Sequence, residues 1–172
     1  MSLHSDLLEQ ARHLANREPK NPRQASLRRA VSSAYYALFH LLVSEATLRL
    51  IPNDPAGLRF QSGRAFDHGN MKNACKSFAN QNIVDPNNQN NLIHLIAIPL
   101  EPELISVAAA FVDLQEARHR ADYNLSLPFE RVAVLQKIDL VQQAMADWST
   151  IRNNPNAKVF LAALLLQHRW NR

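Results

Sequence analysis

Apolar side chains recur every three or four positions along most of this chain, which is the spacing of one face of an α-helix. Five long segments show this pattern, and they begin near Ser5, Pro22, Pro102, Pro128 and Pro155. A shorter helix is expected over residues 68–79. The pattern predicts an all-α fold, an up-and-down helical bundle of about five main helices plus a short helix. We expect residues 1–172 to form a single domain.

Capping residues suggest where these helices begin. Ser5 is a candidate N-cap, and Asn21-Pro22 combines a capping residue with proline at the first helical position. Gln24 lies where a capping box needs its second member. Pro128 is expected in the first turn of the fourth long helix. The last helix, residues 155–172, is apolar on nearly every face, which predicts burial or a subunit contact.

The segment 80–91 differs from the rest of the chain in composition. It holds six asparagines and two glutamines among twelve residues. Such a composition buries little apolar surface, so we expect an Asn-rich mobile loop.

Composition also bears on the compartment. Cys75 is the single cysteine, which excludes an intramolecular disulfide and favours a reducing, cytoplasmic location. The N-terminal residues show no basic stretch followed by an apolar one, so no secretory signal is predicted. The longest purely apolar run, 159–166, has eight residues, whereas a membrane-spanning helix needs about 20. We therefore expect no association with a membrane.

Several catalytic and binding motifs are missing from the sequence. It contains no Gly-rich phosphate loop, no GxSxG, no HExxH and no CxxC. The seven histidines form no pair at positions i and i+4 with a neighbouring carboxylate. The sequence accordingly predicts neither a metal site nor a cofactor. The formal net charge of +4 is compatible with a polyanionic partner.

The third long helix carries a charged residue in an apolar row. Leu104, Val107, Phe111 and Leu114 follow one another at helical spacing, and the next position of the row is Arg118. The Arg118 guanidinium should therefore point inward. Asp122 lies four residues further on, so the two side chains could simply form an intrahelical ion pair.

Three stretches of this chain resemble the HEPN family of small helical domains. The first is residues 27–40, LRRAVSSAYYALFH, which is similar to the family's long Tyr-containing helix. The second is Asp67-His68-Gly69-Asn70 with Phe78 downstream. The third, Arg118 to Tyr123, looks like the R-x-x-A-D-Y form of one branch. The order and spacing of these stretches match the family, and together they span most of residues 25–125.

The resemblance implies a functional site around Arg118. Ribonuclease members of the family carry the R-x4-6-H motif and cleave RNA without a metal ion. Here Arg118 matches the Arg, and Tyr123 occupies the position of the catalytic His. A phenol with a pKa of about 10 is a poor base at neutral pH, so the replacement favours binding over catalysis. The family further implies a homodimer with a polar cleft between subunits, and a role in toxin–antitoxin or defence systems.

Three functions follow as hypotheses. The first is a protein that binds RNA or a nucleotide through a cleft lined by Arg118, His119, Asp122, Tyr123, Arg29 and Tyr36. The second is a metal-independent endoribonuclease toxin in which Arg118 and Tyr123, or a histidine such as His40 or His68, act on RNA. The third is a non-catalytic interaction module that binds a nucleotidyltransferase-type partner protein through its apolar last helix. Arg28 and Arg29 could contact phosphate or belong to a solvated helix face.

Overall fold

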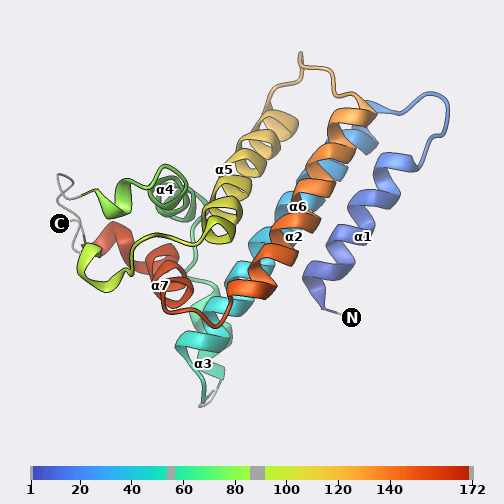
Figure 1. Cartoon of the computed structure of the whole chain (residues 1–172). Coiled ribbons are helices and arrows are strands. Elements are labelled where there is room, and N and C mark those ends of the chain that lie inside the picture. The colour runs from blue at the N-terminus through green and yellow to red at the C-terminus, as the bar shows by residue number, and fades with distance from the viewer. Residues whose placement is uncertain (1, 54–56, 86–91, 171–172) are drawn as a thin grey trace. The chain divides into compact units, whose positions relative to one another are not determined.

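The fold is all-helical, as predicted. The computed structural model describes residues 2–53, 57–85 and 92–170, and within these ranges it contains α- and 3₁₀-helices and no strand (Figure 1). Its elements are α1 (Leu3–Asn16), α2 (Gln24–Leu50), α3 (Leu58–Gly63), α4 (His68–Ala79), η2 (Asn82–Val84), η3 (Ile93–Leu95), α5 (Pro102–Tyr123), α6 (Arg131–Ile151) and α7 (Pro155–Trp170).

The predicted short helix is confirmed, and three helix starts need correction. The helix α4 spans 68–79, and the Asp67 side chain caps it by accepting from the backbone N–H groups of Gly69 and Asn70. The helix α1 begins at Leu3 with Ser2 as its N-cap, so Ser5 lies inside the helix.

The starts of α2 and α6 were placed too early. Pro22 precedes the first helical residue of α2, Gln24, instead of occupying that position. Gln24 does not act in a capping box, because its amide pairs with the backbone N–H and C=O of Phe129 at 2.8 and 2.9 Å. Pro128 lies in the loop before α6, which begins at Arg131.

The predicted Asn-rich loop is partly helical. Residues 82–84 form η2, and Ile83 is fully buried, so this segment buries more apolar surface than its composition suggested. Gln81 precedes it with a φ of 56°, a left-handed conformation in the turn between α4 and η2. Residues 86–91, on which the rest of the prediction falls, lie outside the described residues.

The chain forms two compact units. Unit 1 consists of Met1–Leu41 and Ala110–Ala146, and unit 2 consists of Leu42–Ala109 and Asp147–Arg172. The three long helices α2, α5 and α6 contribute residues to both units. The single domain over residues 1–172 stays a prediction.

Unit 1 is a group of four helical segments. Its α1 runs alongside α6, where Arg12 donates to Asp139 at 2.8 Å (Figure 1). The first part of α2 packs against the last part of α5, and the ring of Tyr35 lies 5.5 Å from that of Phe111. The largest buried side chains of unit 1 come from these helices and include Leu27, Tyr35, Leu38, Phe111 and Leu114.

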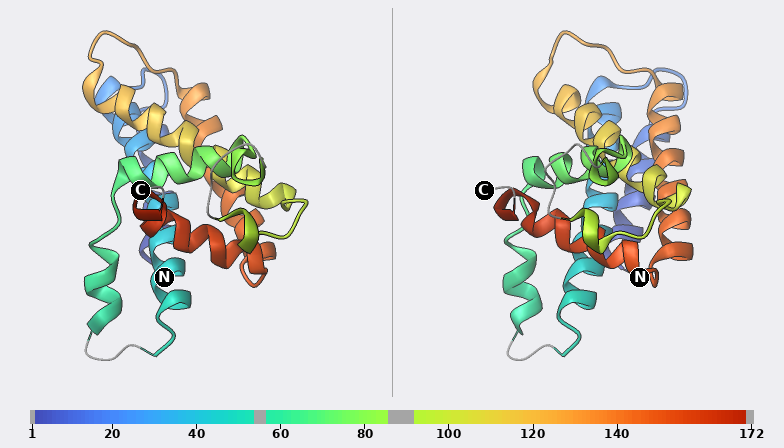
Figure 2. Two further views of the ribbon diagram at one scale, coloured as in Figure 1. Left: turned by 90° about the vertical axis from the view of Figure 1, so that its left-hand side faces the viewer. Right: turned by 60° about the vertical axis from the view of Figure 1, so that its left-hand side comes forward.

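Unit 2 is organised around α4 and α7. Figure 2 shows α7 next to α4, and the rings of Phe78 and Phe160 meet edge to face at 5.0 Å. The Gln167 side chain adds a hydrogen bond of 2.9 Å to Ser77. Seven residues of α7 are buried, and this burial explains why its sequence is apolar on nearly every face.

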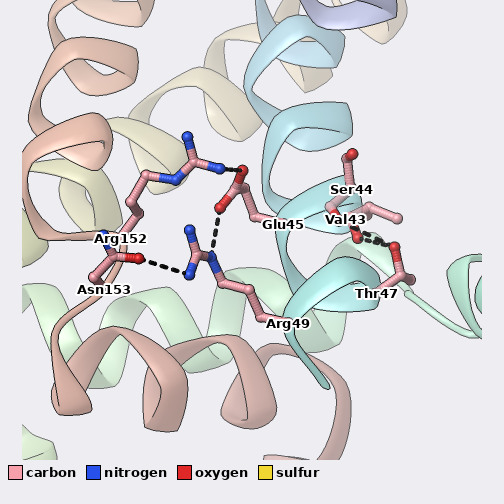
Figure 3. A network of polar contacts seen from close by, with 7 residues as sticks. All are labelled: Val43, Ser44, Glu45, Thr47, Arg49, Arg152 and Asn153. Carbon is pink, nitrogen blue, oxygen red and sulfur yellow. Dashed lines mark hydrogen bonds and ion pairs between the residues drawn. The ribbon is translucent and has the colours of Figure 1, made fainter. Parts of the chain in front are cut away.

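A charged network ties α2 to the end of α6 in unit 2. The carboxylate of Glu45 accepts from Arg49 at 2.8 Å and from Arg152 at 2.6 Å, and Arg49 also donates to Asn153 (Figure 3). The Glu45 side chain is only 9% exposed, so both guanidinium groups are needed to offset the cost of burying its charge.

None of the helices in the described ranges is both long enough and apolar enough to span a bilayer.

Candidate functional site

The Arg118 side chain of α5 points inward, as the apolar row of the sequence predicted. Phe111, Leu114 and Ala121 of the apolar row are buried, and the Arg118 side chain among them is 17% exposed. A guanidinium is held this far from water only where neighbouring groups replace its hydration. Those neighbours come from α5 itself and from the facing part of α2 in unit 1. We call Arg118, Asp122, Tyr123, Ser32, Tyr35 and Tyr36 the Arg118 cluster.

Asp122 provides the negative charge of the Arg118 cluster. Its Oδ2 lies 2.7 Å from Nε of Arg118, and the pair has the i, i+4 spacing that the sequence allowed for. Its Oδ1 accepts a hydrogen bond of 2.7 Å from the hydroxyl of Ser32 on α2. Asp122 therefore fixes the guanidinium and also connects α5 to α2.

Three tyrosine rings surround the guanidinium. The Arg118 Cζ lies 5.9 Å from the ring centroid of Tyr35, 5.6 Å from that of Tyr36 and 6.0 Å from that of Tyr123. These distances are within the range of cation–π attraction. Nη2 of Arg118 also donates to the Tyr36 hydroxyl at 3.3 Å. Tyr35 is fully buried and serves packing, whereas Tyr36 turns its hydroxyl toward the cation.

The outer part of the cluster is open to solvent. Tyr123 is 64% exposed, and the ring of His119 lies 4.9 Å from it at a tilt of 50°. Arg29, the remaining predicted binding residue, is exposed on α2. It precedes Tyr36 by seven residues, or nearly two turns, so the two residues share a face of α2 about 10 Å apart along the axis. The structure thus brings together Arg118, Asp122, Tyr36, Tyr123 and His119, and leaves Arg29 at the edge.

A histidine continues the same face of α2. The rings of Tyr36 and His40 are stacked, with centroids 6.1 Å apart and planes 29° from parallel. Burial lowers the pKa of His40, and the nearby His4 acts in the same direction. His40 is therefore neutral at pH 7 and able to accept a proton.

Arg28 has a role that the sequence did not reveal. Its guanidinium is engaged by backbone carbonyls instead of lying on a solvated helix face, and a phosphate patch with Arg29 stays a prediction. Its guanidinium donates to the backbone carbonyls of Ala121, Asn124, Leu125 and Leu127, at 2.7–3.3 Å. The guanidinium thus satisfies carbonyls at and beyond the C-terminal end of α5, where helical partners run out. Nothing in the spacing of the sequence indicated this, because Arg28 and its acceptors lie more than ninety residues apart.

The apolar last helix is mostly committed to unit 2. Leu161 of this helix is fully buried, so a charge there would disrupt the core of unit 2 directly. Leu165 is half-buried and Leu166 is 37% exposed. The nucleotidyltransferase-type partner stays a prediction.

Potential metal ligands do not gather anywhere in the described ranges, where no group of three or more His, Cys, Asp or Glu side chains could hold an ion. Burial raises the pKa of the Cys75 thiol, which is fully enclosed by unit 2 and therefore stays in its unreactive protonated form.

Comparison with known proteins gave no relative. No family model matches this chain, and no curated protein or solved structure does so either. The resemblance to the HEPN family accordingly stays a prediction that depends on the motifs quoted above.

Proposed function

We propose that this chain is a HEPN-like protein that binds RNA or a nucleotide through the Arg118 cluster. The observation that carries the proposal is the guanidinium of Arg118, held between three tyrosine rings at the edge of a solvent-exposed aromatic pair. Its Nη1 donates to none of the residues that the structure describes. An arginine has five N–H donors, so this group retains donors for a phosphate.

The aromatic residues supply the second half of nucleotide recognition. Single-stranded RNA is bound by stacking its bases on aromatic side chains, at about 1–3 kcal/mol per base, while cations contact the backbone. Tyr123 and His119 expose their rings beside Arg118, and Arg29 adds a cation on the neighbouring face. A base on Tyr123 and a phosphate at Arg118 would use both features together.

The Arg118–Asp122 pair is better explained by binding than by helix stability. At i, i+4 the favourable order places the acid before the base, and here the base comes first. Asp122 instead orients the guanidinium, since it holds Nε while its second oxygen is bonded to Ser32. The carboxylate lowers the net positive charge, so we expect moderate affinity that falls with salt.

The family resemblance adds the biological setting to this proposal. It implies a homodimer in which two copies of Arg118 face one cleft, a cytoplasmic location, and a place in a toxin–antitoxin or defence system. A second guanidinium in the same cleft would add further charge-assisted donors for the same phosphate.

A metal-independent endoribonuclease is the second candidate, and His40 is the observation that favours it. Attack of the RNA 2′-hydroxyl on its own phosphate needs a group that accepts a proton near pH 7 and a cation that stabilises the added charge. The neutral imidazole of His40 stacks on Tyr36, whose hydroxyl contacts Arg118. His40 meets the requirement for a base better than the phenol of Tyr123 does.

One experiment tests binding and cleavage together. The chain is incubated with a labelled single-stranded RNA in EDTA, and binding is followed by fluorescence anisotropy and cleavage by gel electrophoresis. Arg118→Ala should weaken binding about tenfold, because it removes one charge-assisted phosphate contact, and should reduce the salt dependence by about one ion. Arg64→Ala, an exposed arginine of unit 2, is the matched control and should bind like the unaltered chain.

Equal affinity of the Arg118→Ala variant and the unaltered chain would refute the proposal, provided that circular dichroism shows both to be folded. Cleavage that is lost in Arg118→Ala and in His40→Gln would establish the ribonuclease. RNA that stays intact while bound supports the binding protein alone.

A further inference from the structure

A pocket in unit 1 lies away from the Arg118 cluster. Its volume is about 280 Å³, near the lower end of the range for small-molecule sites. The floor is formed by Val31 of α2, Ala117 of α5 and Val134 of α6, which are almost fully buried. On an ideal helix, Arg118 and the pocket residue Arg120 point about 160° apart, so the two sites use different faces of α5.

Two polar clamps hold the loop that forms the pocket wall. Arg28 donates to the carbonyls of Asn124, Leu125 and Leu127, and its Cζ lies 5.2 Å from the ring centroid of Phe129. The Gln24 amide pairs with both backbone groups of Phe129. The loop from 124 to 129 is thereby fixed before any ligand arrives, which lowers the entropic cost of binding.

Of the three charged side chains that line this pocket, one is paired within the part of the chain that the structure describes and two are not. Lys137 is neutralised by Asp113, with Nζ 2.6 Å from Oδ2. Arg120 and Glu130 also line the pocket and are exposed, yet within the described ranges neither side chain makes an ion pair or hydrogen bond, even with the other. One positive and one negative group therefore remain at the rim of an apolar cavity.

We propose that this pocket binds a small zwitterion with an apolar body, of the class of free hydrophobic amino acids. The ligand carboxylate pairs with Arg120 and its ammonium with Glu130, while its side chain lies on the apolar floor beside Phe129. A ligand with a single charge would satisfy one rim group and place its charge near a group of the same sign. A zwitterion pairs with both Arg120 and Glu130, and the apolar residues of the pocket floor exclude water from its side chain.

Calorimetric titration of the full chain tests the proposal with three related compounds. The compounds are L-phenylalanine, hydrocinnamate, which lacks the ammonium group, and phenethylamine, which lacks the carboxylate. We expect L-phenylalanine to bind about tenfold more tightly than either of the others, since each lacks one charge-assisted contact. Arg120→Ala and Glu130→Ala should each reduce its affinity to the level of the compound that lacks the matching group.

Two further variants separate the pocket from general effects. Ala133→Phe places a ring into the pocket from an exposed position of α6 and should abolish binding, with the helical content unchanged. Arg64→Ala should bind like the unaltered chain. Hydrocinnamate binding as tightly as L-phenylalanine, unaltered affinity in Arg120→Ala, or absence of binding by all three compounds would each overturn the proposal. None of these results depends on RNA binding at the Arg118 cluster.

Discussion

Each unit of the molecule contains an arginine paired with a carboxylate four residues away on the same helix, and the two pairs differ in almost everything else. In unit 2, Glu45 precedes Arg49 on α2, which is the favourable order. In unit 1, Arg118 precedes Asp122 on α5, which is the less favourable order. The two pairs thus share the i, i+4 spacing but have opposite orders of charge.

The surroundings decide what each pair does. Glu45 is 9% exposed, and a second arginine, Arg152 in the turn after α6, also donates to it (Figure 3). Asp122 is 23% exposed, and tyrosine rings surround the arginine beside it. The first site joins α2 to the end of α6 through one carboxylate that accepts from two arginines. The second leaves part of a guanidinium, an exposed phenol and an imidazole at the surface.

The comparison shows that an Arg–carboxylate pair is not evidence of function by its spacing alone. A second cation that shares the carboxylate indicates a structural role, whereas aromatic rings around the cation indicate a binding role. Replacing each carboxylate by its amide, in Glu45→Gln and in Asp122→Asn, therefore tests this difference.

The largest expected effect is on stability, in Glu45→Gln. The substitution leaves two guanidinium groups facing one neutral amide, so we expect the free energy of unfolding to fall by about 2 kcal/mol. This figure lies below the range for fully buried pairs, because Arg152 is 40% exposed and can be hydrated. Urea denaturation followed by circular dichroism measures the change. A loss below about 0.5 kcal/mol would show that the network of unit 2 contributes no more than a surface ion pair.

A smaller stability change, combined with a gain of binding, is expected in Asp122→Asn. The amide oxygen can still accept from Ser32, so the loss should stay below about 1 kcal/mol. Removing one negative charge beside Arg118 should raise the affinity for single-stranded RNA about threefold at low salt. The same anisotropy assay measures it. The contrast would be refuted if Asp122→Asn bound RNA more weakly and also lost as much stability as Glu45→Gln. The two ion pairs would then have equivalent, structural roles.

The smallest expected effect is a pH dependence in unit 1. Burial lowers the folded-state pKa of His40 below its ordinary value of 6.5, so the unfolded chain binds a proton more readily than the folded one. Stability is therefore unaffected above pH 6.5 and is lost as the pH falls through that value toward the folded-state pKa. His40→Gln should reduce the loss of stability between about pH 7 and pH 5, measured by urea denaturation. His13→Gln, an exposed histidine of α1, should leave the loss unchanged.

Much of the fold followed from local pattern. The spacing of apolar residues predicted the helical segments and gave the bounds of α4, because a helix face that meets the core must repeat every three to four residues. The starts of α2 and α6 were misplaced for one common reason. Gln24 and the backbone of Phe129 pair with each other across the fold, and that long-range contact overrides the local capping signal.

The candidate site, too, was predictable from the sequence only in part. The apolar row of α5 by itself predicted that Arg118 points inward, and the spacing to Asp122 allowed their ion pair, since both follow from the geometry of one helix. Only the tertiary structure placed three tyrosine rings around the cation, turned His40 onto Tyr36 and committed Arg28 to a loop. These contacts join residues that are far apart in the chain, and side-chain packing between helices, rather than any local preference, determines which of them meet.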